Sequence, residues 1–183
     1  NSYTNYDCEF HWGEINKLSS VNSKSLSKQH FVIKSIWTHV FKNSSDTFMD
    51  LCAKLHLHQK GTKFINCFNS SYAVNSFSGD DEHYFFLHAI HSVINAEFIA
   101  NNDIVFLYKS KFPLDKYFLS SNNKLIDLVR RLRKHQRFVE IPNEVSPHVL
   151  IDHGLLTISM AYTSPSLEAL IQGKKAIYFD YKC

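Results

Sequence analysis

The sequence predicts an α/β fold, with a Rossmann-like, mostly parallel sheet and helices on both faces. Five short apolar runs have the length of buried strands, and they lie at residues 63–68, 103–108, 138–141, 155–160 and 176–179. Segments with apolar residues at helical spacing separate most of these runs. Strands that alternate with helices are typical of parallel sheets, because a parallel connection needs a crossover that is usually a helix.

The composition indicates a globular protein with one core. The chain has 183 residues, of which 44% are hydrophobic, and a formal net charge of +3. A domain of this size buries about 70% of its unfolded surface. The small charge gives little support for a nucleic-acid partner, and no stretch reaches the roughly 20 apolar residues of a transmembrane helix. The four widely spaced Cys residues are typical of reduced thiols in a cytoplasmic protein.

The N-terminal part differs in composition from the rest. Residues 1–30 are polar and rich in Asn and Ser, apart from an island at residues 10–14. We predict that residues 1–30 are a polar linker or the remnant of a preceding domain and that residues 31–183 form the α/β domain. The chain has no initiator Met and stops directly after an apolar run. We therefore expect truncation at both ends and an N-terminal domain outside this chain.

Capping residues and apolar spacing place the helices between the strands. Ser or Asp at the start and, in two cases, Gly beyond the end mark their limits. The predicted helices span about 44–59, 80–100, 124–133, 147–152 and 164–172, and a further short strand is predicted at 30–33. The helix at 124–133 has a basic outer face, which we interpret as solvated surface or as a peripheral contact with anionic lipid.

Residues 155–180 contain the strongest functional signal, a strand, a helix and a second strand. Thr163 or Ser164 is placed to be the N-cap of this helix. Pro165 suits the first helical position, and Gly173 suits the left-handed position after the helix. Hydroxyls and free N–H groups at a helix N-terminus favour an anion, because the donors and the helix dipole point the same way. Phosphate is the expected ligand.

Glu168 extends this hypothesis from a phosphate to a nucleotide. It lies about one turn inside the predicted helix, where its carboxylate could accept hydrogen bonds from a ribose diol beyond the phosphate. The alternative is that the Ser, Thr and Pro residues are ordinary capping residues of a helix that binds nothing.

The segment 162–180 resembles the donor-binding segment of GT-B glycosyltransferases, especially bacterial enzymes of surface and capsular polysaccharide biosynthesis. The shared pattern is a Ser/Thr-rich turn, a Glu-Ala pair, a Gly four residues after the Ala and then a strand. This chain meets it with Thr163, Ser164, Ser166, Glu168, Ala169 and Gly173. The resemblance implies one half of a GT-B fold, with the three hydroxyl residues on the donor phosphates and the Glu on the ribose. Polymer glycerophosphotransferases and, more loosely, nucleotide-sugar epimerases share the motif.

The same resemblance implies weaker site residues on other strands. Lys109 or Lys111, at the end of the strand near 103–108, is expected beside the donor diphosphate. Ile141 and Pro142 are expected to contact the base. Ser71, in the polar turn after strand 63–68, is a candidate for the cleft.

The resemblance implies glycosyl transfer by a cytoplasmic protein, either free or peripheral to the inner face of the membrane. We expect the donor-binding half of a nucleotide-sugar-dependent glycosyltransferase, with no cofactor beyond the donor and with a glycan or lipid-linked glycan as acceptor. His88 and His91 share a helix face, but no third ligand follows at a telling spacing, so no metal is expected. The general base would come from the missing N-terminal half, so this chain is expected to be inactive alone. The alternatives are a CDP-alcohol-dependent polymer glycerophosphotransferase and a non-catalytic α/β interaction domain.

Overall fold

The chain forms two compact units, Asn1–Lys42 and Asn43–Cys183. Its structure, a computed structural model, describes residues 8–12, 29–33, 44–57, 61–69, 80–96, 103–111, 114–115, 123–160 and 163–180. The boundary between the units lies later than the one predicted after residue 30. The reason is that β2 (Gln29–Ile33) pairs in parallel with β1 (Cys8–Trp12), which belongs to the first unit.

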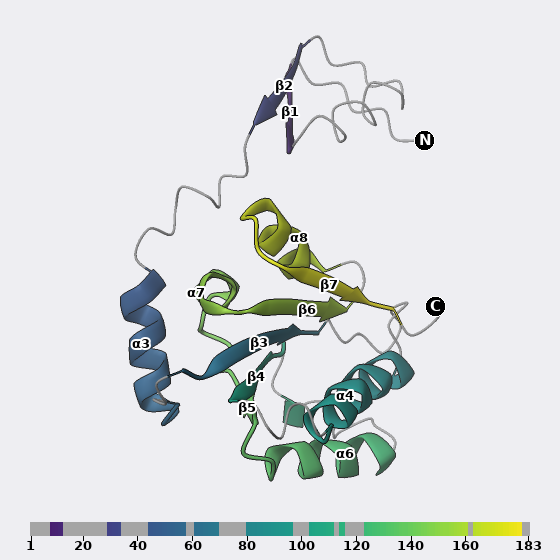
Figure 1. The fold of residues 1–183 in the computed structure, drawn as a ribbon. Coiled ribbons are helices and arrows are strands. Elements are labelled where there is room, and N and C mark those ends of the chain that lie inside the picture. Colours follow the sequence, from purple (N-terminus) through teal and green to yellow (C-terminus); the bar gives the residue numbers. More distant parts are fainter. Residues whose placement is uncertain are drawn as a thin grey trace. The chain divides into compact units, whose positions relative to one another are not determined.

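The second unit is built on a five-stranded sheet in which all neighbouring strands are parallel (Figure 1). The order across the sheet is β5-β4-β3-β6-β7. The strands are β3 (Lys63–Phe68), β4 (Ile104–Lys109), β5 (Phe138–Glu140), β6 (Leu156–Met160) and β7 (Ala176–Phe179). The chain moves outward from β3 through β4 to β5 and then returns to place β6 on the other side of β3. The direction of winding therefore reverses between β3 and β6.

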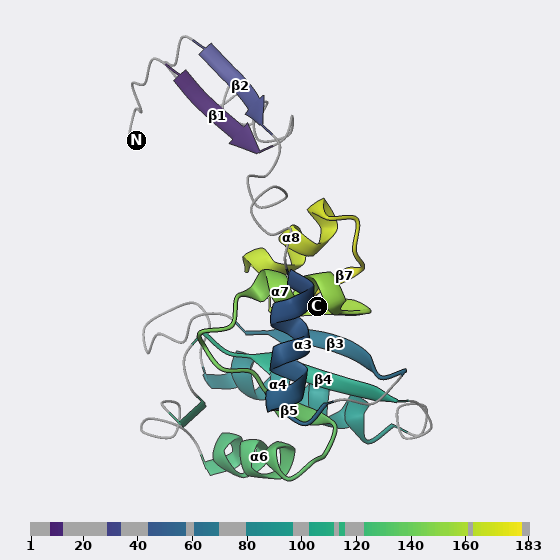
Figure 2. The same ribbon diagram turned by 90° about the vertical axis from the view of Figure 1, so that its left-hand side faces the viewer.

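Helices cover both faces of this sheet (Figure 2). One face carries α4 (Asp80–Ile94) and α6 (Asn123–Arg133). The opposite face carries α3 (Ser44–Lys54), α7 (Pro147–His153) and α8 (Ser164–Ile171). The predicted Rossmann-like α/β fold with helices on both faces is therefore confirmed. Among the described helices, none is long and apolar enough to cross a bilayer.

Two apolar cores lie between the sheet and these helices. Successive residues of a strand face opposite sides, so β3 directs Ile65 and Cys67 toward α4, and Phe64 and Phe68 toward α3. Burial of one such large side chain stabilises the fold by about 1.5–3 kcal/mol. Because β3 is covered on both faces, its residues 64–68 are all buried and, apart from Asn66, apolar, while Lys63 at its start is exposed.

The predicted elements agree with the observed ones except at some ends. β3 and β7 have the predicted limits, and Gly173 has the left-handed φ of 73° expected after α8. α3 and α4 end earlier than predicted, at Lys54 and Ile94. In α3 the cause is local, because His56 has a φ of 54°, which does not continue a right-handed helix.

Candidate functional site

The candidate site lies at the carboxyl edge of the sheet, where the winding reverses between β3 and β6. Open parallel sheets bind ligands beyond the carboxyl ends of their strands at such a reversal. Phe68, the last residue of β3, pairs with Ser159 of β6, so the two strands end side by side. Asn69 follows β3 directly, and Thr163 follows β6 at the start of α8. β4, on the other side of β3, ends at Lys109.

Asn69 joins the ends of β3 and β4. Its Nδ2 donates to Oγ of Ser110 at 2.9 Å, and its Oδ1 accepts from the backbone N–H of Lys111 at 3.0 Å. Asn69 and Ser110 are both buried. The buried amide of Asn69 thus donates one hydrogen bond and accepts another, and these bonds fix the segments that follow β3 and β4 relative to each other. The sequence predicted a polar turn here, and the bridge itself was missed because its partners lie on a different strand.

Lys109 turns its ammonium group toward the loop that follows β5. Its Nζ donates to the carbonyl oxygen of Pro142 at 3.3 Å and to that of Asn143 at 3.0 Å. Burial lowers the pKa of Lys109, and the nearby Glu144 carboxylate acts in the opposite direction. Two of the three ammonium donors are thus held by loop carbonyls. This arrangement differs from the predicted contact with a diphosphate, and it makes Lys109 the anchor of the loop.

The predicted base-contacting residues have different environments. The side chain of Ile141 is buried in the core on the α3 side, and its N–H donates to the carbonyl of Tyr108 at 2.8 Å. Its side chain is therefore a core group, and the base contact expected from the backbone of this loop stays a prediction. Pro142 is exposed, and its carbonyl is the one that accepts from Lys109. Ser71 lies outside the described residues.

The N-terminus of α8 opens toward the carboxyl edge. Thr163 is the N-cap, but its hydroxyl donates to the carbonyl of Met160 at 2.7 Å and makes no cap to the helix. The carbonyl of Thr163 accepts from the Tyr178 hydroxyl at 3.2 Å. Ser164, the first helical residue, is exposed. The first N–H groups of α8 therefore have no cap from the Thr163 side chain, and they lie at the positive end of the helix dipole.

Ser166 occupies a structural position in place of the predicted phosphate-binding one. Its side chain is fully buried, at 0% exposure. Its Oγ accepts from Oγ of Ser159 at 2.6 Å and donates to the carbonyl of Ile177 at 3.0 Å. These bonds tie α8 to β6 and β7. A buried hydroxyl that already makes these two hydrogen bonds reaches a phosphate only if they break.

Glu168 lies against His148 of the neighbouring helix α7. The Oε2 atom of Glu168 is 3.2 Å from Nδ1 of His148, and the two side chains are 14% and 7% exposed. The two atoms are close but do not have the alignment of a good hydrogen bond. The contact becomes an ion pair when the imidazole is protonated. This pairing was not predicted, because the two residues lie on different helices and only the packing of α7 on α8 brings them together.

Metal-ligating residues do not cluster in the part of the chain that the structure describes. No group of three His, Cys, Asp or Glu side chains there could hold an ion. The chemistry offered by the described edge is therefore that of hydrogen-bond donors at a helix N-terminus and of a partly buried carboxylate one turn further along.

A family model matches residues 67–182, and its description is polysaccharide biosynthesis PFTS motif protein. This chain belongs to that family. The matched range begins at the end of β3 and runs through β7, so it includes the whole carboxyl edge described above. Membership gives the protein a role in polysaccharide biosynthesis.

One solved structure with a similar fold is that of S. aureus MnaA with UDP. The TM-score is 0.55 at 16% sequence identity, and the match covers 96% of this chain and 42% of the MnaA chain. At this identity the likeness concerns the fold, and it supports the Rossmann-like assignment. The chain thus spans less than half the length of that protein. No curated protein matches the chain.

Proposed function

We propose that the second unit is the donor-binding half of a nucleotide-sugar-dependent glycosyltransferase of polysaccharide biosynthesis. The N-terminus of α8 carries the proposal, because exposed Ser164 and helix N–H groups without a Thr163 side-chain cap lie beside the reversal of winding. Family membership and a fold similar to a protein solved with UDP support it. The resemblance of residues 162–180 to the donor-binding segment of GT-B enzymes supplies the reaction type.

The proposed chemistry is stabilisation of the leaving phosphate. The helix N–H groups and the Ser164 hydroxyl would donate hydrogen bonds to the diphosphate of the nucleotide sugar. The positive end of the helix dipole would stabilise the negative charge that develops on this diphosphate as the sugar departs. Glu168 would accept hydrogen bonds from the ribose. The loop anchored by Lys109 would lie beside the base and contact it through the backbone of Ile141 and Pro142. The proposal requires no cofactor beyond the donor.

The family description adds one detail. Read as one-letter residue codes, PFTS ends in Thr-Ser, and this chain carries Thr163-Ser164 where α8 begins. This match supports a functional role for the start of α8 within the family.

The acceptor and the general base belong, in this proposal, to another part of the protein. The similar MnaA chain is more than twice as long as the region matched here. We expect the 183-residue chain to bind a donor without turnover, and we expect the acceptor to be a glycan or a lipid-linked glycan. The basic outer face of α6 suits a peripheral contact with anionic lipid at the inner face of the membrane.

Calorimetric titration of the 183-residue chain with UDP, GDP, CDP, CMP and dTDP tests the donor site. Ser164→Asp places a carboxylate at the helix N-terminus, where it favours the helix but repels a phosphate. We expect one nucleotide class to bind to the wild type, and we expect Ser164→Asp to lower the affinity for it about tenfold or more. Ser92→Asp, which adds the same charge on an exposed position of α4, is the matched control and should leave binding unchanged.

The titration separates the alternatives by its outcome. Preference for CDP would favour a polymer glycerophosphotransferase. Absence of binding to all five nucleotides, or equal affinity of wild type and Ser164→Asp, would contradict a donor site at α8.

A further inference from the structure

We propose that His148 is a positioning residue that holds Glu168 for a ribose diol, and that the site therefore selects ribonucleotide donors over 2′-deoxyribonucleotide donors. The inference rests on the proposed function, since it assigns the α8 site a substrate class. It is drawn from the contact between the two helices.

The geometry places a carboxylate one helical turn from the proposed phosphate site. Ser164 begins α8, and Glu168 follows four residues later, about 6 Å along the helix axis. Residues at this spacing lie on the same side of a helix. A ligand whose phosphate sits at the N-terminus would thus extend its sugar along the side of α8 that carries Glu168.

The packing of α7 against α8 places an imidazole beside that carboxylate. Oε2 of Glu168 is buried and lies 3.2 Å from Nδ1 of His148. Because Oε2 is buried, the 14% exposure of the side chain comes from its other atoms. One oxygen therefore faces the imidazole, and the proposal assigns the ribose to the other oxygen, Oε1. A free Glu side chain loses conformational entropy when it binds a ligand, and a side chain already held by its neighbour loses less.

The chemistry of a held carboxylate matches a diol. A carboxylate only accepts hydrogen bonds, and two neighbouring hydroxyls each offer one donor. Such bonds are stronger in a partly buried position than in water. Removal of the 2′-hydroxyl takes away one donor and leaves an acceptor without its partner, which costs affinity. dTDP, which lacks this hydroxyl, is accordingly a poor donor nucleotide in this inference.

The test compares UDP, CDP and GDP with their 2′-deoxy counterparts by calorimetry on the 183-residue chain. For the nucleotide that binds, we expect the wild type to prefer the ribose form about tenfold. His148→Phe keeps a ring of similar size but has no donor, and it should reduce the preference to about twofold or less. His148→Asn retains an N–H near the position of Nδ1 and should keep the larger part of the preference.

Two further variants separate positioning from a general loss of structure. Glu168→Gln should abolish the preference, and the double variant His148→Phe/Glu168→Gln should be no worse than Glu168→Gln alone. His153→Phe is the matched control on the same helix, because His153 stacks on Phe48 of α3 at a centroid distance of 4.3 Å and not on α8. The control should keep the full preference for the ribose form.

The outcomes distinguish this inference from the function on which it rests. A nucleotide that binds with the same ribose preference in His148→Phe as in the wild type overturns the positioning role and leaves the donor site intact. Equal binding of ribose and deoxyribose forms by the wild type also overturns it. Absence of binding to every nucleotide overturns the proposed function and this inference together.

Discussion

Ser166 shows how a residue chosen for its chemistry can have a structural role. Its hydroxyl connects Ser159 on β6 with the carbonyl of Ile177 on β7, at 2.6 and 3.0 Å. We expect Ser166→Ala to destabilise the protein by about 1–3 kcal/mol, because buried Ser159 and the carbonyl of Ile177 each lose a hydrogen bond. Urea unfolding followed by circular dichroism measures this, with Ser164→Ala at the exposed neighbouring position as the control, which should change stability by less than about 0.5 kcal/mol.

A Ser166→Ala variant as stable as the Ser164→Ala control would contradict this role for the hydroxyl. It would show that water or a shifted neighbour supplies the hydrogen bonds that the Ser159 hydroxyl and the Ile177 carbonyl lose.

At the residue scale the sequence predicted where α8 begins but not which of its hydroxyls faces solvent. The start of the helix follows from local capping and from Pro165, and these are properties of neighbouring residues. The direction of Ser166 depends on the sheet, since β6 and β7 meet the same side of α8. The Lys109 contact with the loop after β5 has the same origin, because the loop is distant in sequence.

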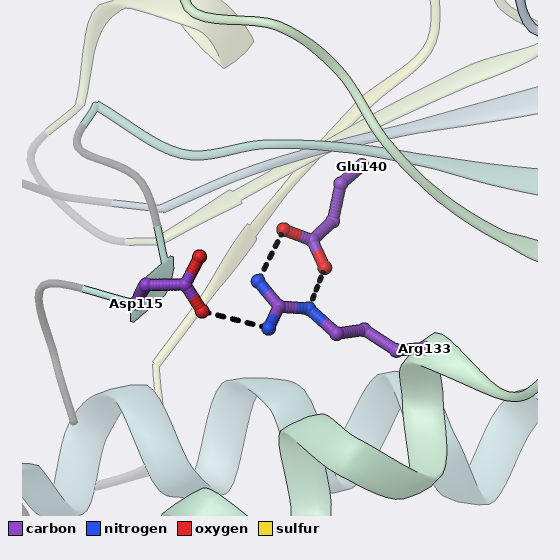
Figure 3. Close-up of polar contacts among 3 residues, drawn as sticks. All are labelled: Asp115, Arg133 and Glu140. Carbon is purple, nitrogen blue, oxygen red and sulfur yellow. Dashed lines mark hydrogen bonds and ion pairs between the residues drawn. The ribbon is translucent and has the colours of Figure 1, made fainter.

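The end of α6 is fixed by one arginine that joins three elements (Figure 3). Arg133 donates from Nε and Nη2 to the two carboxylate oxygens of Glu140, the last residue of β5, at 2.5 and 3.1 Å. Its Nη1 donates to Asp115, beyond the end of β4, at 2.7 Å. These hydrogen bonds, that of Glu140 first, raise the pKa of Arg133. A planar guanidinium satisfies both carboxylates at once, which a lysine ammonium does not reproduce.

We expect Arg133→Lys to destabilise the protein by about 1 kcal/mol, because the fork of donors is lost in a network that is only partly exposed. The measurement is urea unfolding in low and high salt. The difference in the free energy of unfolding between wild type and variant should be smaller at high salt, because salt screens exposed ion pairs. Arg130→Lys on the same helix is the control, since the ion pair described for Arg130, to Asp127 at 3.4 Å, lies at an exposed position. Equal losses in the two variants would argue against a special role for Arg133.

At the element scale the strands were the most predictable parts. A buried strand of a parallel sheet is apolar on both faces, so its limits are visible in the sequence, as for β3. β7 is also an apolar run, but it lies at the edge of the sheet, where Ile177 and Tyr178 are exposed. Helix ends were less predictable, because apolar residues at helical spacing, Leu55 after α3 and Phe98 after α4, continue beyond the last helical turn. The left-handed His56 that ends α3 has no strong sequence signal, since His is enriched in this conformation but only a few per cent of non-Gly residues adopt it.

For the whole molecule, the reversal of winding between β3 and β6 determines where the candidate site lies. Strand order depends on long-range pairing, and the sequence predicted a parallel sheet without predicting that β3 lies at its centre. Once that order is known, the carboxyl ends of β3 and β6 and the N-terminus of α8 come together at one edge. The resemblance of residues 162–180 supplied the same location independently.

The division into two units leads to a prediction about folding. The five-stranded sheet and both apolar cores lie within Asn43–Cys183, whereas β1 and β2 form a two-stranded sheet in the first unit. We expect a chain of residues 43–183 to fold alone, because it retains every strand pairing and core contact described for the sheet. Urea unfolding should give a single transition with the midpoint of the full chain, and nucleotide affinity should be unchanged. A truncated chain that fails to unfold cooperatively, or that loses affinity while the full chain binds, would mean that residues 1–42 contribute to the fold or to the site.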